Sequence, residues 1–207
     1  MRREDLDHIV RAAGDVINED EVIVAGSQAA LAQFPEGLPK LATLSVEADL
    51  VALDDPNDIK ATQINGAIGE DTLFHETYGY YAEGVGRALL VLPPGWEGRV
   101  HRATSSGQRD VTGIYPEIHD LAVAKLAAGR DKDFAWARAL FQSGHLEPAT
   151  LLERAGSTPL EPHQQRFILA AVREAPPPGR RSRRNVRRLT NLLEQTGCCQ
   201  PDKMMTA

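Results

Sequence analysis

The sequence predicts an α+β protein, with a mixed sheet core and helices packed on it, followed by a helical C-terminal region. Three observations indicate this fold class. Helical and strand-like apolar patterns alternate in the N-terminal part, short strand-like segments continue up to residue 115, and the apolar spacing is helical from residue 116 onward. Of the 207 residues, 42% are hydrophobic and 25% are charged, the usual balance of a globular domain.

The first element is an amphipathic helix over residues 6–17, where apolar residues recur at helical spacing with charged residues between them. A short buried strand leads to Gly26-Ser27, and a second strand begins with acids that alternate with small or apolar residues. The segment 71–82, which holds three of the four tyrosines, fits neither pattern. The predicted strands cover residues 21–25, 45–53, 87–92, 100–104 and 111–115, with 100–104 paired to 87–92. The predicted helices cover residues 6–17, 28–34, 58–68, 121–128, 134–141, 149–154, 163–174 and 183–195.

These elements divide the chain into three predicted regions: an α/β core (1–115), a helical region packed on it (116–175), and a Pro-rich linker with a basic C-terminal helix and tail (176–207). Two adjacent cysteines, Cys198 and Cys199, provide neither a disulfide framework nor a spaced zinc set. No apolar run is long enough for a membrane span, and the N-terminus MRREDLDHIV is charged. We expect a cytoplasmic protein without a membrane partner.

The formal net charge of −6 is unevenly distributed. Residues 173–188 contain seven arginines and one glutamate, so the rest of the chain carries a charge of −12. Arginine binds phosphate through two parallel hydrogen bonds, so Arg180–Arg188 could contact a nucleic-acid backbone. The same segment could also bind an acidic partner or the acidic body, or form a solvated charged helix.

Glu47 and Asp49 are the strongest local chemical signal. Residues two apart on a strand point to the same face, so their carboxylates lie side by side. Two such carboxylates repel unless a cation lies between them, and their oxygens suit Mg²⁺. The alternative is a solvated strand end with two acids of no function.

Gly26 and Ser27 stand between a buried strand and a helix. Such a turn presents backbone N–H groups and a hydroxyl to an anion such as phosphate. The alternative is that Ser27 only caps the helix. The order of strand, Gly-Ser, helix and a strand with two acids places a phosphate cradle and a metal pair on neighbouring strands.

Three segments in this order resemble the nucleotidyltransferase-fold family. VIVAGSQAAL (22–31) and LSVEADLVAL (44–53) are similar to its Gly-Ser turn and its Ser/Thr-x-Asp-x-Asp strand. HDLAVAKLAAGRDKDFAWARAL (119–140) is similar to the Lys…Arg…Asp stretch of AbiEii-type nucleotidyltransferase toxins and their uncharacterised relatives. The resemblance implies binding of a nucleoside triphosphate (NTP) with Mg²⁺, and transfer of a nucleotidyl group to RNA or protein.

The resemblance also implies roles for individual residues, carried over position by position. Gly26 lets the triphosphate approach, Ser27 contacts it, and Lys125 offers charge to the phosphates or orients the acceptor. Arg130 and Asp133 match the Arg and the following acidic residue of the third motif. The implied catalytic residues are Glu47, Asp49, Lys125 and Asp133, the metal ligands Glu47 and Asp49, and the nucleotide-binding residues Gly26, Ser27 and Arg130.

Two departures from the family pattern leave a second hypothesis open. Glu47 stands where the family usually has Asp, and the later predicted strands, 87–92 and 100–104, contain no acid. We therefore expect the third carboxylate of the family to be missing. The alternative function is a catalytically silent member of the fold that binds a partner or nucleic acid. An interaction module unrelated to nucleotides is a third possibility.

Overall fold

The computed structural model describes residues 1–175 and 180–197, and for residues 180–184 and 196–197 it describes the backbone alone. The helices are α1 (Arg3–Ile17), α2 (Ala30–Gln33), α3 (Ile59–Ile68), α4 (Leu73–Tyr78), α5 (Ile118–Ala128), α6 (Asp131–Gln142), α7 (Pro148–Ser157), α8 (Pro162–Arg173) and α9 (Arg180–Gly197). The strands are β1 (Glu21–Val24), β2 (Glu47–Val51), β3 (Tyr81–Gly84), β4 (His101–Ser105) and β5 (Val111–Tyr115). Four 3₁₀ turns are η1 (Ser27–Ala29), η2 (Lys40–Thr43), η3 (Arg87–Leu89) and η4 (Trp96–Arg99).

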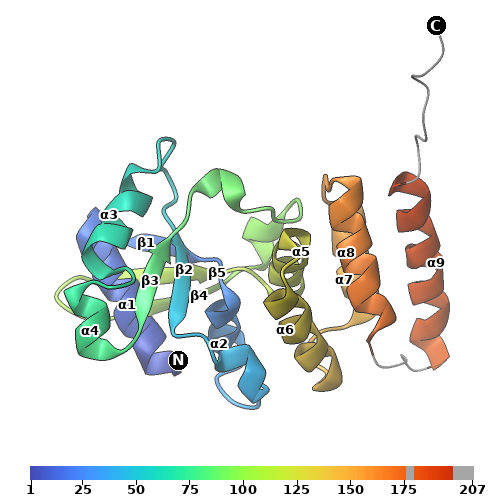
Figure 1. The fold of residues 1–207 in the computed structure, drawn as a ribbon, viewed down its shortest axis with the longest axis horizontal. Coiled ribbons are helices and arrows are strands. Elements are labelled where there is room, and N and C mark those ends of the chain that lie inside the picture. Colours follow the sequence, from blue (N-terminus) through green and yellow to red (C-terminus); the bar gives the residue numbers. More distant parts are fainter. Residues whose placement is uncertain (176–179, 198–207) are drawn as a thin grey trace, which may run out of the picture.

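The five strands form one mixed sheet in the order β3-β2-β1-β5-β4. β1 runs antiparallel to β2 and parallel to β5, β3 is parallel to β2, and β4 is antiparallel to β5. Helices α5 to α9 lie on one side of the molecule, with α9 furthest from the sheet, and α1 and α3 lie on the other side (Figure 1). The predicted α+β class, a mixed sheet with helices packed on it and a helical C-terminal region, is confirmed.

Helix α1 lies against the sheet because its apolar stripe and one glycine allow close packing. Leu6, Ile9 and Val10 are fully buried. A Cβ on Gly14 would lie 2.5 Å from a methyl carbon of Val111, so only glycine allows α1 to approach β5 this closely. The helix ends at Asn18, which adopts the left-handed conformation with φ 56°.

The helical predictions are confirmed, but one predicted strand is wrong. Residues 87–92 contain the 3₁₀ turn η3 and no strand. β1 is already flanked by β2 and β5, and the strand predicted at 100–104 pairs with β5 instead of with 87–92. The apolar side chains of Leu90 and Leu92 instead pack against a small cluster around Trp96. The unassigned tyrosine-rich segment forms α4 and leads into β3.

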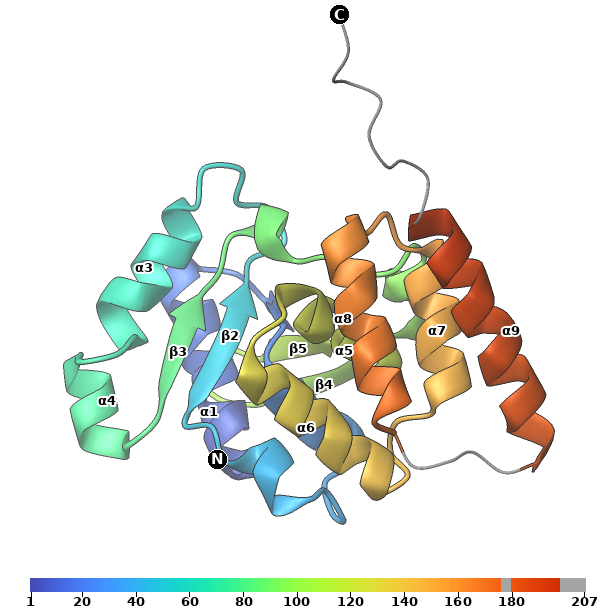
Figure 2. The ribbon, with the colours of Figure 1, turned by 45° about the vertical axis from the view of Figure 1, so that its right-hand side comes forward.

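Figure 2 shows α6 in front of the sheet, with α7, α8 and α9 beside one another. α9 packs against α7 and α8, and its Leu193 is 3% exposed. The predicted linker at Pro176–Gly179 and the cysteines Cys198 and Cys199 lie outside the described residues. No helix within 1–175 and 180–197 combines the length and the apolar character that a membrane crossing needs.

Candidate active site

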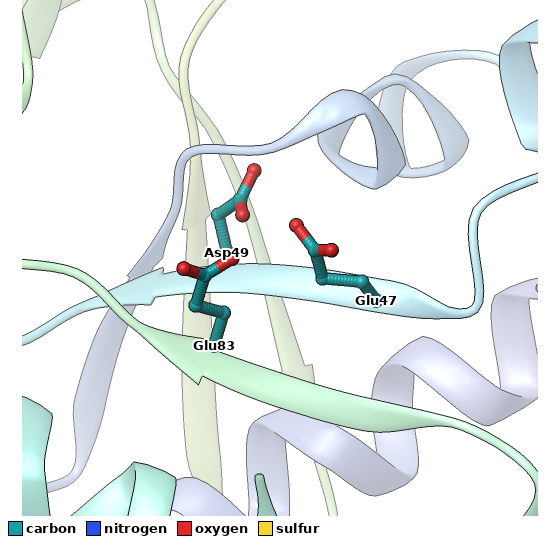
Figure 3. Close-up of side chains that lie close together, drawn as sticks. All are labelled: Glu47, Asp49 and Glu83. Atoms are coloured by element: carbon teal, nitrogen blue, oxygen red, sulfur yellow. The ribbon is translucent and has the colours of Figure 1, made fainter. Parts of the chain in front are cut away.

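Three carboxylates converge on one face of strands β2 and β3. Glu47 and Asp49 point to the same face of β2, while the intervening Ala48 is buried on the other face. The parallel register of β2 and β3 places Glu83 directly opposite Asp49. Carboxylate oxygens of Glu47, Asp49 and Glu83 all lie within 4.8 Å of one another, and Figure 3 shows the three side chains pointing together.

Glu83 corrects the expectation that a third carboxylate is missing. That expectation followed from the wrong strand at 87–92, which contains no acid. The strand beside β2 is β3, in which Ala82 is buried while Tyr81 and Glu83 point to the other face. The short alternation in YAEG was the signal for this strand, although it covers only four residues.

The Gly26-Ser27 turn lies directly over Asp49. The backbone N–H of Ala25 donates to the carbonyl of Asp49 at 2.9 Å, which continues the pairing of β1 with β2. A Cβ on Gly26 would lie 2.3 Å from Oδ2 of Asp49. Gly26 has an ordinary φ of −81°, so glycine is needed here for close approach and not for conformation. Ser27 begins η1, whose N-cap is Gly26, so Ser27 is not the cap.

The three carboxylates influence one another's protonation. Burial raises the pKa of Asp49 to about 7, and the hydrogen bond and charge of Glu47 act in the same direction. Burial, followed by Glu47, also raises the pKa of Glu83. Burial acts to raise the pKa of Glu47 too, but hydrogen bonds with Asp49, Glu83 and Tyr81 outweigh it, so this pKa is lowered. Glu47 is therefore the group that ionises first.

A buried aspartate holds two cations beside these carboxylates. Asp133 on α6 is fully buried. Its Oδ1 lies 3.0 Å from Nζ of Lys125 on α5, and its Oδ2 accepts a hydrogen bond of 2.7 Å from Nε of Arg130. Because Asp133 is occupied by both cations, it positions them and does not itself face the carboxylates as a free ligand.

Lys132 is a third cation at this site, which the sequence analysis did not select. Its side chain is exposed, and it forms no ion pair within 4 Å among the described residues. Its positive charge acts to lower the pKa of both Glu47 and Glu83. The site therefore contains two cations that are paired with Asp133, the buried Lys125 and the exposed Arg130, and one exposed cation that has no ion pair among the described residues.

Except for Glu83, these groups line one pocket of about 420 Å³. Glu83 lies beside it and lines a neighbouring hollow with Glu47. Six of the seven site residues predicted from the sequence are among its lining; Gly26 is not, but it lies against Asp49. The lining residues are Ser27, Leu41, Leu44, Ser45, Glu47, Asp49, Lys125, Arg130, Lys132, Asp133, Ala135 and Trp136. The volume falls in the range of small-molecule sites.

The carboxylates fit an oxygen-liganded divalent cation. The nearby Lys125 and Arg130 pair with Asp133. Among the described residues, no lysine or arginine pairs within 4 Å with any of the three carboxylates. Buried carboxylates that crowd one another keep protons, and burial followed by the neighbouring Glu47 raises the pKa of Asp49 in this way. A hard divalent cation would replace those protons, and three carboxylate oxygens are suitable ligands for it.

The fold and this site define a nucleotidyltransferase-like protein, with carboxylates on two neighbouring strands beside a Gly-Ser turn. Residues 4–155 match the family described as "Nucleotidyltransferase of unknown function (DUF6036)", and the chain belongs to this family. Comparison with curated proteins and with solved structures found no match.

Proposed function

We propose that the chain binds an NTP with Mg²⁺ in this pocket and transfers its nucleotidyl group to an acceptor. One observation carries the proposal: two of the three carboxylates, Glu47 and Asp49, share a single pocket with three cations and Ser27, and Glu83 lies directly beside that pair. Nucleotidyl transfer requires negative groups that hold a metal and positive groups that hold phosphates. The family supports this class of reaction.

Each group has a distinct role in the proposal. Glu47 and Asp49 hold the metal, which when bound neutralises charge on the reacting phosphate. Arg130 and the exposed Lys132 bind the phosphates, together with the hydroxyl of Ser27. Lys125 supplies positive charge from within the pocket.

Asp133 is a positioning residue in this scheme. Lys125 is only 8% exposed, and its ammonium group is held by Asp133 at 3.0 Å. A cation that is already held in place loses little side-chain entropy when a phosphate binds, so ordering it reduces the binding free energy only slightly. Asp133 thus contributes to the reaction through Lys125 and Arg130.

The reaction forms one bond and breaks one. The hydroxyl oxygen of the acceptor attacks the α-phosphorus of the NTP. The bond from this phosphorus to the oxygen bridging to the β-phosphate breaks, and pyrophosphate leaves with the electron pair. The acceptor proton passes to Glu83, which is the exposed member of the three carboxylates.

The acceptor in this proposal is RNA or a protein hydroxyl. The similarity of segment 119–140 to AbiEii-type toxins also keeps a toxin role as a hypothesis from the sequence. Arg187 and Arg188 of α9 are exposed and line a surface hollow, which suits the backbone of a nucleic acid or an acidic partner. The side chains at positions 180–184 lie outside the description.

The test is a calorimetric titration of the protein with each NTP, with Mg²⁺ and again with EDTA. We expect Mg²⁺-dependent binding that weakens at least about tenfold in Asp49→Ala. Glu36→Ala is the matched control, because Glu36 is an exposed acid outside the pocket and should leave binding unchanged. Absence of Mg²⁺-dependent binding to every NTP would refute the proposal.

A second measurement separates transfer from binding. NTPs labelled at the α-phosphate are incubated with the protein and with total RNA or protein, and covalent label is then followed. Label on an acceptor, lost in Asp49→Ala, is the expected result. Nucleotide binding without any label transfer would instead support the catalytically silent alternative. One of the two arguments for that alternative was the missing third carboxylate, and Glu83 beside Glu47 and Asp49 weakens it.

A further inference from the structure

We propose that an apolar wall formed by Leu41, Leu44 and Trp136 holds the base of the nucleotide, and that it accepts all four bases about equally. This inference rests on the proposed function and names the base subsite of the same pocket. It starts from the composition of the pocket lining, in which apolar side chains adjoin the charged ones.

The apolar lining comes from two elements that pack together. Leu41 lies on η2 and Leu44 follows it directly, whereas Ala135 and Trp136 lie on α6. η2 packs against α6, and the apolar side chains from both segments line the same pocket. Figure 2 shows α6 beside β2, the strand that follows η2 and Leu44 in the chain.

Two leucines of this wall are unusually exposed. Leu44 is 66% exposed and Leu41 is 45% exposed, although both line a pocket. Burying their apolar surface under a planar ligand would stabilise the complex, because apolar area would be removed from water. The wall therefore exposes apolar surface to water at a place where a ligand can cover it.

The charged part of the pocket identifies the ligand that covers the wall. Trp136 is only 3% exposed, and Nζ of Lys125 lies 5.5 Å from the centre of its ring, so the apolar wall directly adjoins a cation. Lys125, Arg130 and Lys132 attract a polyanion, whereas the leucines attract an apolar group. A nucleoside triphosphate combines these two chemistries in one molecule, and its phosphates would bring its base to the wall.

The wall offers no group that reads the edge of a base. Leucine side chains neither donate nor accept hydrogen bonds, and Nε1 of Trp136 is buried. Ser45 is also occupied, since its hydroxyl donates to the carbonyl of Glu47 at 3.2 Å and accepts from the N–H of Glu47 at 3.1 Å. Apolar contact without hydrogen-bond readout distinguishes bases only weakly.

The test compares Mg²⁺-ATP, GTP, CTP and UTP with inorganic tripolyphosphate and Mg²⁺ by calorimetry. We expect ATP to bind about tenfold more tightly than tripolyphosphate, because only ATP has a base to bury. The four NTPs should have Kd values within about threefold of one another.

Two double variants locate the effect. Leu41→Gln with Leu44→Gln should weaken ATP binding to about the level of tripolyphosphate and leave tripolyphosphate binding unchanged. Leu73→Gln with Leu89→Gln is the matched control, since these leucines are 77% and 76% exposed and lie outside the pocket. The control should change neither Kd.

Equal Kd values for ATP and tripolyphosphate in the unmodified protein would overturn the base wall while leaving the proposed nucleotide site intact. Selectivity of more than about tenfold among the four NTPs would overturn the claim of weak base readout. If neither ATP nor tripolyphosphate binds, the proposed function itself fails. The three failures are therefore distinguishable in one set of titrations.

Discussion

At the scale of single residues, Gly26 shows how one missing side chain shapes the site. The distance of 2.3 Å between its ideal Cβ and Oδ2 of Asp49 allows no heavier residue without moving that carboxylate. We predict that Gly26→Ala leaves the chain folded, because φ at this position is −81° and alanine adopts it without strain. Mg²⁺-dependent NTP binding should weaken by about tenfold or more, as measured by calorimetry.

Gly66→Ala is the control for this change. Gly66 lies within α3, and nothing lies within 4 Å of its ideal Cβ. Alanine there should raise the free energy of unfolding by about 0.5–1 kcal/mol and leave nucleotide binding unaltered. Wild-type NTP affinity in Gly26→Ala would contradict the importance of the close approach to Asp49.

The raised pKa of Asp49 implies that the stability of the metal-free protein depends on pH. Burial and Glu47 raise its pKa to about 7, above the value of about 3.9 in an unfolded chain. The folded protein therefore binds this proton more tightly than the unfolded chain, and its stability should fall as pH rises from about 4 through 7. In EDTA, Asp49→Asn should remove this loss, so its melting temperature should exceed that of the unmodified protein more at pH 8 than at pH 5. A gap that does not grow with pH would contradict the raised pKa.

At the scale of elements, sequence patterns identified the helices other than α4, and the strand with Glu47 and Asp49, because those patterns are local. Glu83 was missed because its position depends on parallel pairing between β2 and β3, which are separated by α3 and α4. The apolar run at 87–92 was wrongly predicted as a strand because only its local composition was considered. It is strand-like in composition, yet its side chains pack in a separate cluster with Trp96. Local periodicity predicts which faces are apolar and does not determine which strands pair.

The connection between α5 and α6 gives a prediction at the same scale. Asp133 is fully buried between Lys125 and Arg130, so Asp133→Asn would leave the buried Lys125 without a counter-ion. We expect the free energy of unfolding to fall by about 3–5 kcal/mol in urea titrations. Asp131→Asn, at an exposed acid two residues earlier on α6, should cost less than about 1 kcal/mol. An equal decrease in the free energy of unfolding in the two variants would mean that the buried ion pairs of Asp133 stabilise the fold no more than an exposed acid does.

At the scale of the whole molecule, the regions predicted as 1–115 and 116–175 share one hydrophobic core. A single cluster of buried side chains runs from Leu6 in α1 to Leu193 in α9. The match to the family, over residues 4–155, also crosses the boundary at 115. Charge joins the two regions as well. The fully buried Asp120 on α5 accepts hydrogen bonds of 2.7 and 3.1 Å from Arg99 of η4, and lies 3.4 Å from Arg154 of α7.

This shared core predicts that the two regions unfold together. The chain has two tryptophans, Trp96 in η4 and Trp136 in α6, so each can be made the only one by a Phe substitution of the other. In each single-tryptophan variant, we expect the urea midpoint from fluorescence to coincide with the midpoint from far-UV circular dichroism. Asp120→Asn should lower both midpoints equally, because Asp120 ties the regions together, whereas the exposed Asp110→Asn should leave them in place. If the Trp136 signal changes before the dichroism while the Trp96 signal does not, the helical region unfolds on its own. The candidate active-site pocket is then divided between two independent units.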